Sequence, residues 1–384
     1  MTPTTCPDKA TFSQLLNQTP GLDGRDNRGK KHAVALVISG LVMALCAGRD
    51  GRLSSLHRHM VNHYDALRQA TNSPQQKPVS RSQLPLLLAK INGVLFAKLF
   101  FEWVGVEWDE SQKRWFACDG KELRGSIEAD QRRRQACVSA LDHTTRLVVG
   151  QTYYQGQKES ERPATRQLLN DAGLYSQKLS LDALHLNPLT VNAIADAGGI
   201  YLIGLKANQQ ALHRYCICHA LCGRVAFTRL DDSRRGHGRV EQRSYRCFAL
   251  VRSTLDTRWH AGGPLSLVVV SRRRETLRGT LLSEELSYFV SNAEPTTQAH
   301  ADELFDAVRH HWQVEVMHYQ RDVTLAEDVF RTGVEAINRL MSSLRTLTMS
   351  LLSRCKPKNM AAQLDNFADN LQALIQFLTQ ELVL

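Results

Sequence analysis

WFACDG at residues 115–120 and KLSLDA at residues 178–183 decide the fold class of this chain. Each segment begins as a short apolar strand pattern and ends in an acid, which is Asp119 in the first segment and Asp182 in the second. In α/β folds, acids at the ends of strands face the crevice in which ligands bind. We therefore expect the two carboxylates to lie at one edge of a sheet.

The chain around these segments alternates between strand and helix patterns. From residue 114 to residue 205 the order is β-β-β-α-β-α-β, which predicts a mixed α/β core. The expected core elements are strands at 115–118, within 135–154, at 178–181 and at 200–205, with helices at 163–172 and 189–197. Further strand patterns follow at 225–230, 240–251, 265–272 and 286–291, and helices at 301–325, 334–352 and 360–382.

These patterns predict the following domain organisation. Residues 1–30 are polar and are expected to form a flexible tail, whereas 31–110 predict an all-α domain for DNA binding or dimerisation. The α/β core is expected at 111–354, with a β-rich insertion at about 207–292. Residues 355–384 are expected to form a C-terminal helix.

Composition narrows the class of partner. The 384 residues include 48 Lys and Arg against 38 Asp and Glu, a net charge of +10, and 43% hydrophobic residues. This hydrophobic content excludes a disordered chain, and the charge favours a polyanionic partner. No apolar run has the length of about 20 residues that a membrane span needs. Nine scattered cysteines without a signal peptide favour reduced thiols in the cytoplasm.

A third acid lies in the helix expected at 302–325. The apolar positions of this helix recur every three or four residues and form a stripe that we expect to be buried: Leu304, Val308, Trp312, Val316, Tyr319 and Val323. A polar stripe runs beside it: His311, Glu315, His318 and Asp322. Since Glu315 is only about 100° around the helix from Val316, we expect it to reach the crevice at the strand ends.

Three converging carboxylates suit a hard divalent cation. Mg²⁺ prefers oxygen ligands and keeps several waters, so that a few carboxylates suffice. Two such ions can stabilise both the attacking and the leaving oxygen of a phosphodiester displacement. The residues alone therefore predict a metal-dependent enzyme that acts on nucleic acid.

The sequence resembles DDE transposases of the ISAs1 type, including the H-repeat-associated proteins. The matching segments occur in the family's order: DGKELRGS at 119–126, DALH at 182–185, LKANQ at 205–209, GHGRVEQR at 236–243, HWQVE at 311–315, and DVT at 322–324 with ED at 327–328.

The resemblance implies an RNase H-like catalytic core with Asp119, Asp182 and Glu315 as a DDE triad. It implies two Mg²⁺ or Mn²⁺ ions, and DNA as substrate: the terminal inverted repeats of an insertion sequence and a target DNA. Synapsis of two ends implies at least a homodimer. The expected location is the bacterial cytoplasm, at the nucleoid, with no membrane partner. The motifs add auxiliary residues around the triad: His185, His311, Trp312, His318 and Asp322.

The chain departs from the family pattern after Glu315. Val316 replaces the usual Asn, Tyr319 replaces the usual Trp, and Arg321 stands where an apolar residue is usual. These changes leave a second hypothesis open, namely a catalytically inactive or domesticated DNA-binding relic.

Basic residues of the insertion favour phosphate contacts. We expect DNA binding by Arg234, Arg235, Arg239 and Arg243, and by Lys121, Arg124, Lys206 and Asn208 of the resembling motifs. Arginine clusters at 132–134 and 272–274 add to this charge. An alternative is that arginines at strand edges only discourage edge pairing.

A zinc-dependent regulator is the remaining alternative. Cys216, Cys218, His219 and Cys222 are close in sequence, but a structural zinc site commonly uses two separated pairs of ligands, and a second pair is missing at the usual spacing. His311, Glu315 and His318 also do not match the H-E-x-x-H spacing of a catalytic zinc site.

Overall fold

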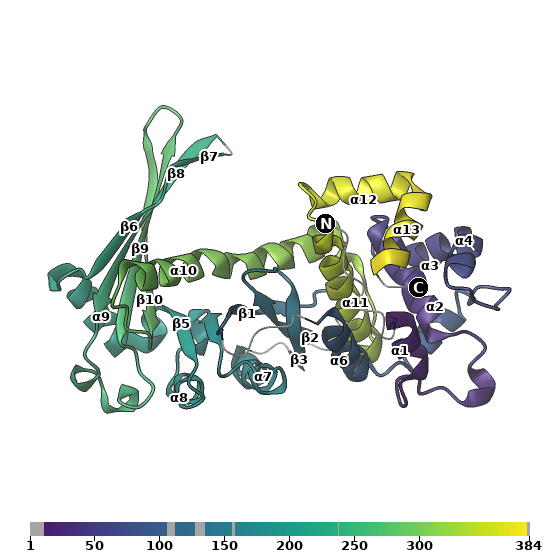
Figure 1. Ribbon diagram of the computed structural model, residues 1–384, viewed down its shortest axis with the longest axis horizontal. Helices are drawn as coiled ribbons and strands as arrows, with labels where there is room; N and C mark the ends of the chain where they lie inside the picture. The colour runs from purple at the N-terminus through teal and green to yellow at the C-terminus, as the bar shows by residue number, and fades with distance from the viewer. Residues whose placement is uncertain (1–10, 106–111, 127–134, 156–157, 237, 382–384) are drawn as a thin grey trace.

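The strand patterns of the sequence assemble into one mixed sheet (Figure 1). The computed structural model describes residues 11–105, 112–126, 135–155, 158–236 and 238–381. Its strands are β1 (Trp115–Glu122), β2 (Gln135–Asp142), β3 (Val148–Gln155), β4 (Lys178–Leu181), β5 (Ile200–Leu205), β6 (Phe227–Leu230), β7 (Arg234–Gly236), β8 (Arg239–Ala249), β9 (Ser266–Thr276) and β10 (Leu281–Ser291). This confirms the predicted mixed α/β fold, and it is the architecture expected of an RNase H-like core.

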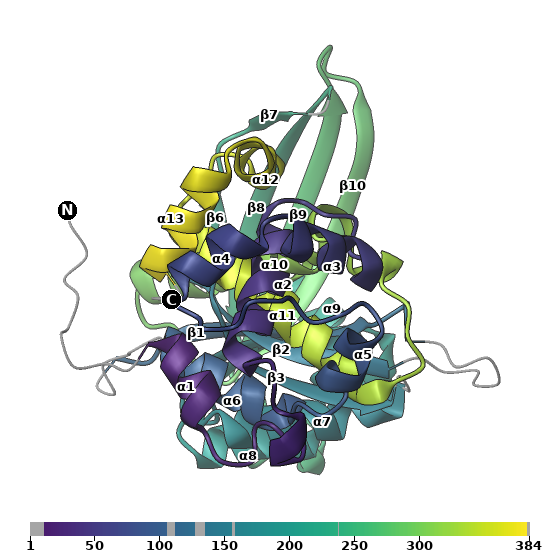
Figure 2. The ribbon, with the colours of Figure 1, turned by 90° about the vertical axis from the view of Figure 1, so that its right-hand side faces the viewer.

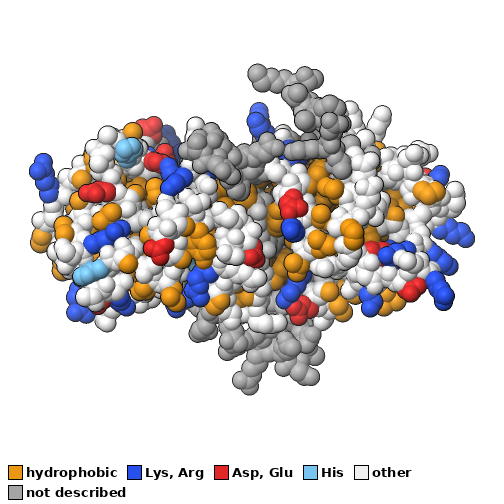
Figure 3. Space-filling model, turned by 60° about the horizontal axis from the view of Figure 1, so that its bottom comes forward, with side chains coloured by type: hydrophobic (Ala, Val, Ile, Leu, Met, Phe, Trp, Pro, Cys, Tyr) orange, Lys and Arg blue, Asp and Glu red, His pale blue; other side chains and the backbone are white. Residues whose placement is uncertain are grey.

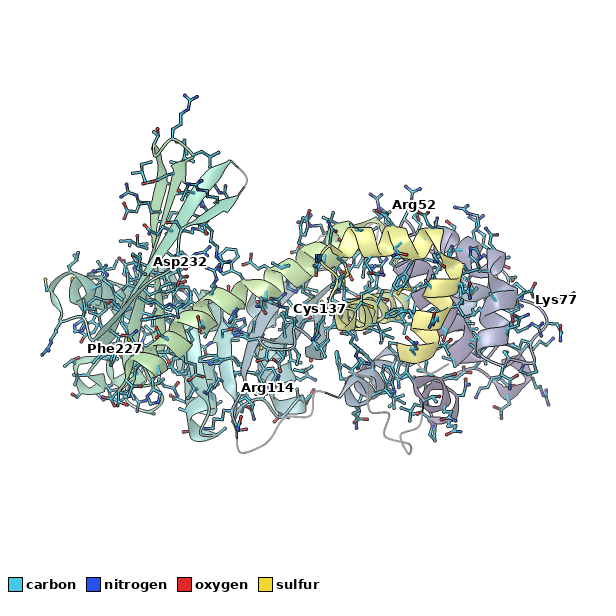
Figure 4. The ribbon with its side chains drawn as sticks, turned by 45° about the horizontal axis from the view of Figure 1, so that its top comes forward. Arg52, Lys77, Arg114, Cys137, Phe227 and Asp232 are labelled. Carbon is cyan, nitrogen blue, oxygen red and sulfur yellow. The ribbon has the colours of Figure 1, made fainter. Side chains whose placement is uncertain are left out.

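The order of the strands is β3-β2-β1-β4-β5-β10-β9-β8-β6, with β7 paired to β8. β4 runs parallel to both β1 and β5, and the remaining pairs are antiparallel. The insertion is therefore a continuation of the core sheet, because β10 pairs directly with β5. β7, β8, β9 and β10 extend beyond the helices as an arm, and Asp232 lies near the base of this arm (Figure 4).

Helices cover both faces of the core sheet. α7 (Lys158–Asp171), α8 (Pro188–Asp196) and α9 (Gln210–Cys222) pack on one face, with Leu168, Ile194 and Leu212 in its apolar layer. α10 (Gln298–Tyr319) crosses the other face and buries Leu304 and Phe305 there. The strand ends are therefore approached by α7, α8 and α9 from one face of the sheet and by α10 from the other.

The apolar stripe that we expect to be buried along α10 is buried only in its first half. Leu304 and Val308 are buried, but the later members are exposed and form an apolar ridge: Trp312, Val316, Tyr319 and Val323. The prediction is wrong here because the stripe advances mainly in steps of four residues, and each such step turns it by about 40° around the helix, away from the sheet. In the second half of α10, Val314 and Met317 make the contact with β1, β2 and β3 instead.

The remaining helices form a second body around one apolar core (Figure 2). These helices are α1 (Phe12–Gln18), α2 (Val34–Cys46), α3 (Leu53–Asn62), α4 (Tyr64–Ala70), α5 (Gln83–Leu88), α6 (Gly93–Val104), α11 (Glu335–Arg354), α12 (Met360–Asp369) and α13 (Leu371–Glu381). Every residue of α2 is buried, as its apolar sequence requires. Lys77 lies at the end of this body farthest from the arm (Figure 4).

Two boundary predictions are wrong in this helical body. The expected flexible tail contains α1, whose Phe12 and Leu16 are buried, and Thr11 closes its N-terminus with a capping box. The expected single C-terminal helix breaks at Asn370, whose side-chain oxygen accepts from the backbone N–H of Ala373 and caps α13. The N-terminal and C-terminal helices thus share one core.

None of the helices in the described part of the chain combines the length and apolar composition that a membrane span needs.

Candidate active site

The register of two parallel strands brings the first two predicted acids together. Cys118 of β1 is paired with Leu181 of β4, so that Asp119 and Asp182 follow on neighbouring strands. Asp182 ends β4 as expected. Asp119 lies inside β1, which continues to Glu122, because β1 also pairs with β2 along this stretch. The predicted position of Asp119 at a strand end is therefore wrong, although its neighbour is the expected one.

Two histidines of α10 face Asp119. His318 Nδ1 lies 3.4 Å from Asp119 Oδ2, and His311 Nδ1 lies 3.1 Å from the hydroxyl of Ser180 on β4. Burial opposes the charge of Asp119, but the hydrogen bond and charge of His318, together with His311, hold the pKa of this carboxyl below its ordinary value. Asp119 is therefore kept ionised on the α10 side of the sheet.

Glu315 reaches the same neighbourhood from α10. Burial and the negative charge of Asp119 raise the pKa of Glu315, whereas the ammonium of Lys206 opposes that rise. Lys206 follows directly after β5, next to the strand that ends in Asp182. The structure thus brings Glu315 within electrostatic reach of both Asp119 and Lys206.

A fourth acid, Glu161 of α7, approaches from the opposite face. Side chains alternate along a strand, so Ala117 and Asp119 face α10 while Cys118 and Gly120 face α7. A Cβ atom on Gly120 would lie 2.6 Å from the carboxyl carbon of Glu161. Glu161 therefore occupies the space that the missing side chain of Gly120 leaves open, beside Asp119.

Glu161 contacts the segment that follows β4. His185 Nε2 lies 3.3 Å from Glu161 Oε1 and 3.7 Å from Asp182 Oδ1, and the hydroxyl of Tyr154 donates to Glu161 Oε2 at 3.0 Å. The ligand atoms of Glu161, Asp182 and His185 all lie within 4.8 Å of one another. Among the described residues this is the one such group of possible metal ligands, and it includes a single member of the predicted triad.

Sequence reasoning missed Glu161 because it placed the start of the helix too late. The sequence pattern predicts a helix only from residue 163. The helix begins at Lys158 instead, with Pro163 inside it. Had the acidic segment before Pro163 been included in the helix, Glu161 would have been a candidate one turn from its start.

Hydrogen bonds hold the backbone of the DALH segment. Arg162 Nε donates to the carbonyl of Leu184, and the amides of Asn208 and Gln209 donate to the carbonyls of Ala183 and Leu186. The LKANQ segment therefore supports the DALH segment. This contact gives Asn208, which the sequence assigns to DNA, a role inside the protein.

Lys121 also lies inside the protein. Its side chain is 6% exposed, and its ammonium lies 2.6 Å from Asp322 and 3.2 Å from Glu327. We call the surrounding charged residues the ion-pair cluster: Lys121, Arg321, Asp322, Glu327, Asp328 and Arg345. The expected DNA contact by Lys121 is therefore replaced by buried ion pairs, and the auxiliary residue Asp322 belongs here. Arg124 remains 66% exposed, 3.4 Å from Asp328.

Arg321 and Glu327 form the centre of the ion-pair cluster. Arg321 is fully buried and donates through Nε and Nη2 to the carboxylate of Glu327. It also lies against Cys137, near the C-terminal end of α10 (Figure 4). Burial alone would raise the pKa of Glu327, but Arg321, Lys121 and Arg345 lower it to about 2. Arg321, the departure from the family pattern, thus has a partner within the fold.

A large groove lies along α10, and its lining includes residues of the arm and of the segment that leads into α12. Its volume is about 1290 Å³, more than the roughly 300–1,000 Å³ of small-molecule sites. Of the described residues that line it, the charged ones are all basic: Arg146, Arg234, Arg243, Arg272, Arg309, Arg354, Lys356 and Lys358. Arg235 and Arg239 lie beside it on β7 and β8, and the arginine cluster at 132–134 lies outside the described residues.

The opposite side of the molecule differs from the groove. Figure 3 shows acidic and basic side chains intermixed there, with hydrophobic groups between them. α10 separates the groove from the carboxylates, because Gln313 and Met317 line the groove whereas Glu315 and His318 are directed toward Asp119. The exposed apolar ridge of α10 begins at Trp312, which lies 51% exposed at the groove.

The cysteines considered as zinc ligands do not converge on one site. Cys216 is buried in the core, whereas Cys218 and Cys222 are exposed, and His219 Nε2 contacts the carbonyl of Ala249. Cys216 and Cys218 are two residues apart on α9 and point in nearly opposite directions. The zinc alternative therefore has no support among the described residues.

Comparison with known proteins places these features in a family. Residues 102–332 match the family model "Transposase DDE domain". The "H repeat-associated putative transposase YhhI" of Escherichia coli strain K12 is 24% identical over 346 residues, 87% of this chain and 88% of that protein. The "Putative transposase YncI" of Escherichia coli O157:H7 is 25% identical over 281 residues, 70% of each chain. "Putative protein YbfL" of strain K12 is 26% identical over 306 residues, 77% of this chain and 78% of that protein.

Proposed function

The chain belongs to the transposase DDE domain family, and we propose that it cleaves and joins DNA strands at the ends of an insertion sequence of the ISAs1 type. The proposed catalytic residues are Asp119, Asp182 and Glu315. The observation that carries this proposal is the pairing of β1 with β4, which sets the two aspartates side by side while α10 directs Glu315 toward them.

The donor set fits a divalent cation. Asp119, Glu161 and Asp182 concentrate negative charge, and among the described residues none of them forms an ion pair with a Lys or Arg. Bound Mg²⁺ or Mn²⁺ would supply activation of the attacking oxygen and stabilisation of the leaving 3′-oxyanion. The residues that would hold the ions are Asp119, Asp182 and Glu315, and two ions are part of the proposal.

The surrounding residues have defined roles in this proposal. His318 and His311 orient Asp119 and keep it ionised. The charge of Lys206 opposes the rise in the pKa of Glu315, and Lys206 is proposed to contact the scissile phosphate. Asn208 fixes the backbone after Asp182 through the carbonyl of Ala183. These groups position the acids and the substrate before the reaction begins.

DNA is proposed to lie in the basic groove along α10. Arg234 and Arg243 belong to its lining, and Arg235 and Arg239 extend the charge along the arm. Phosphate contacts release counterions, so that binding should weaken steeply as salt increases. Since the groove and the acids lie on different sides of α10, the strand to be cut would cross the apolar ridge at Trp312. At least two copies of the chain would take part in synapsis.

The test is cleavage of a labelled duplex that carries the flanking element end, with Mg²⁺ or Mn²⁺. We expect the wild type to nick this duplex, and Asp119→Asn, Asp182→Asn and Glu315→Gln each to lose nicking by at least about 10³-fold, since metal ligands contribute several kcal/mol. DNA binding should remain. Asp196→Asn and Glu294→Gln, at exposed acids outside the site, are matched controls.

Two outcomes would overturn parts of the proposal. Retained cleavage in Glu315→Gln would remove Glu315 from the triad. DNA binding without nicking by the wild type would favour the relic hypothesis, which the changed residues around Glu315 motivate.

A further inference from the structure

We propose that Glu161, Asp182 and His185 hold one divalent cation on the α7 side of the sheet, with His185 as a nitrogen ligand. This position is separate from the pair Asp119 and Glu315 on the α10 side. The inference deepens the proposed function and rests on it for the reaction that the cation would serve. Its residues come from α7 and from the segment after β4.

The spacing of the ligand atoms suits an octahedral ion. Bonds of about 2.1 Å place neighbouring ligands about 3.0 Å apart and opposite ligands about 4.2 Å apart. His185 Nε2 lies 3.3 Å from Glu161 Oε1 and 3.7 Å from Asp182 Oδ1, and the whole group lies within 4.8 Å. An ion placed between these atoms would therefore need only small side-chain movements.

The imidazole of His185 is the independent observation that points to a ligand. His185 is 1% exposed, and neither of its ring nitrogens has a hydrogen-bond partner among the described residues. Buried polar atoms are nearly always paired, so an unpaired ring nitrogen needs an explanation. Nε2 is directed toward two carboxylates, where a cation would satisfy it.

The other atoms of the site are already held in place. Tyr154 donates to Glu161 Oε2, which leaves Oε1 on the side of His185. The backbone N–H of Leu184 donates to Asp182 Oδ1, which fixes that carboxylate at the start of a short 3₁₀ turn. Gly120 leaves the space in which the Glu161 carboxylate lies. A preorganised first shell of this kind is what a metal site needs.

The donor set favours Mn²⁺ over Mg²⁺. Carboxylates serve both ions, but Mg²⁺ prefers oxygen, whereas imidazole suits transition metals. Two carboxylates and one imidazole therefore select for a transition metal at this position. The alternative is a simple ion pair, in which a protonated His185 links the two carboxylates without any metal.

The test measures Mn²⁺ binding to the full chain without DNA, by titration calorimetry and by pulsed electron paramagnetic resonance. We expect a nitrogen coupling on the bound Mn²⁺ of the wild type. Glu161→Gln should weaken one class of Mn²⁺ site by at least about tenfold. His185→Gln places an amide oxygen at the same reach, so it should retain binding but lose the nitrogen coupling and the preference for Mn²⁺ over Mg²⁺.

Further variants keep the inference falsifiable. Gly120→Ala should weaken Mn²⁺ binding by pushing the carboxylate of Glu161 aside, while all the ligands remain. Asp196→Asn should bind Mn²⁺ as the wild type does, and circular dichroism checks that each variant folds. Unchanged Mn²⁺ affinity in Glu161→Gln, or absence of nitrogen coupling in the wild type, would overturn the inference and favour the ion pair.

The failure of this inference is distinguishable from failure of the proposed function. If Glu315→Gln keeps its nicking activity while Glu161→Gln loses Mn²⁺, the triad is wrong and the cation position stands. If Glu315→Gln loses nicking while Glu161→Gln binds Mn²⁺ normally, the triad stands and this cation position does not.

Discussion

Two groups of acids lie near β1, one around Asp119 and the other around Lys121. They differ in which positively charged residues balance the negative charge of the acids. In the ion-pair cluster, Glu327 and Asp322 are matched by Lys121 and Arg321 at short distances. In the other group, which we call the carboxylate site, the acids are Asp119, Glu161, Asp182 and Glu315. Among the described residues, the cations that form ion pairs with this second group are histidines only.

This difference distinguishes acids that stabilise the fold, in the ion-pair cluster, from acids that are available to a ligand, in the carboxylate site. A buried acid that a protein cation neutralises contributes to the fold, because removal of either partner leaves the other uncompensated. Burial of an acid without such a partner costs free energy, and a bound cation can offset this cost. Neighbouring positions of β1 therefore contribute to groups with different purposes, Asp119 to the carboxylate site and Lys121 to the ion-pair cluster. Three experiments test this comparison.

The largest expected effect is on stability, from the same acid-to-amide change at both groups. Glu327→Gln should lower the free energy of unfolding by about 3–5 kcal/mol, because it leaves the buried Arg321 without its partner. Asp182→Asn should change it by about 0.5 kcal/mol or less, since it removes a poorly compensated charge. Urea unfolding with a chelator present measures both. An equal loss in the two variants would remove the distinction between the groups.

The second effect is the gain of stability from a metal. At a Mn²⁺ concentration about 100 times its dissociation constant, the wild type should gain about 2.7 kcal/mol. Glu327→Gln should keep this gain although its starting stability is lower, whereas Asp182→Asn should lose most of it. Thermal unfolding with and without Mn²⁺ gives the comparison, with Ca²⁺-free buffer throughout. A gain that survives in Asp182→Asn would place the metal elsewhere.

The smallest effect, taken per pH unit, is the dependence of stability on pH. The pKa of Glu327 is lowered to about 2 in the folded chain, so its contribution is present above the ordinary pKa of a glutamate and is lost as the pH falls toward about 2. The free energy of unfolding should fall by at most about 1.4 kcal/mol per pH unit from this group. Glu327→Gln should show a flatter slope between pH 5 and pH 2 in urea unfolding. Equal slopes would contradict the assignment.

Much of the α/β core could be predicted from local patterns. The alternation around 115–120 and 178–183 predicts the strands, and the structure confirms the β-β-β-α-β-α-β order through β5. The nearness of Asp119 and Asp182 was expected because each acid follows a short apolar strand pattern, and the pairing of Cys118 with Leu181 agrees with it. These features depend on periodicity within single elements, which a sequence displays directly.

The parts that could not be predicted depend on tertiary contacts. Burial of Lys121 is set by Asp322 and Glu327, which lie about 200 residues away in sequence. Exposure of Val316 depends on which face of α10 packs on β1, β2 and β3, and there Val314 and Met317 make the contact. Glu161 was missed because the helix was expected at 163–172, whereas it begins at Lys158.

Arg345 of α11 has a consequence for how the chain can be divided. Its guanidinium donates to the carbonyl of Leu325, just after α10, and to the carbonyl of Gly51 in the helical body. The family match ends at 332, before α11 begins, so it leaves out a helix whose Arg345 holds both the end of α10 and the helical body. A fragment cut at the family boundary would carry Glu327 without Arg345 and would expose the apolar surface that α11 covers. The boundary of the family match and the boundary suggested by packing therefore differ. An expression fragment should include α11 and the helical body that it contacts.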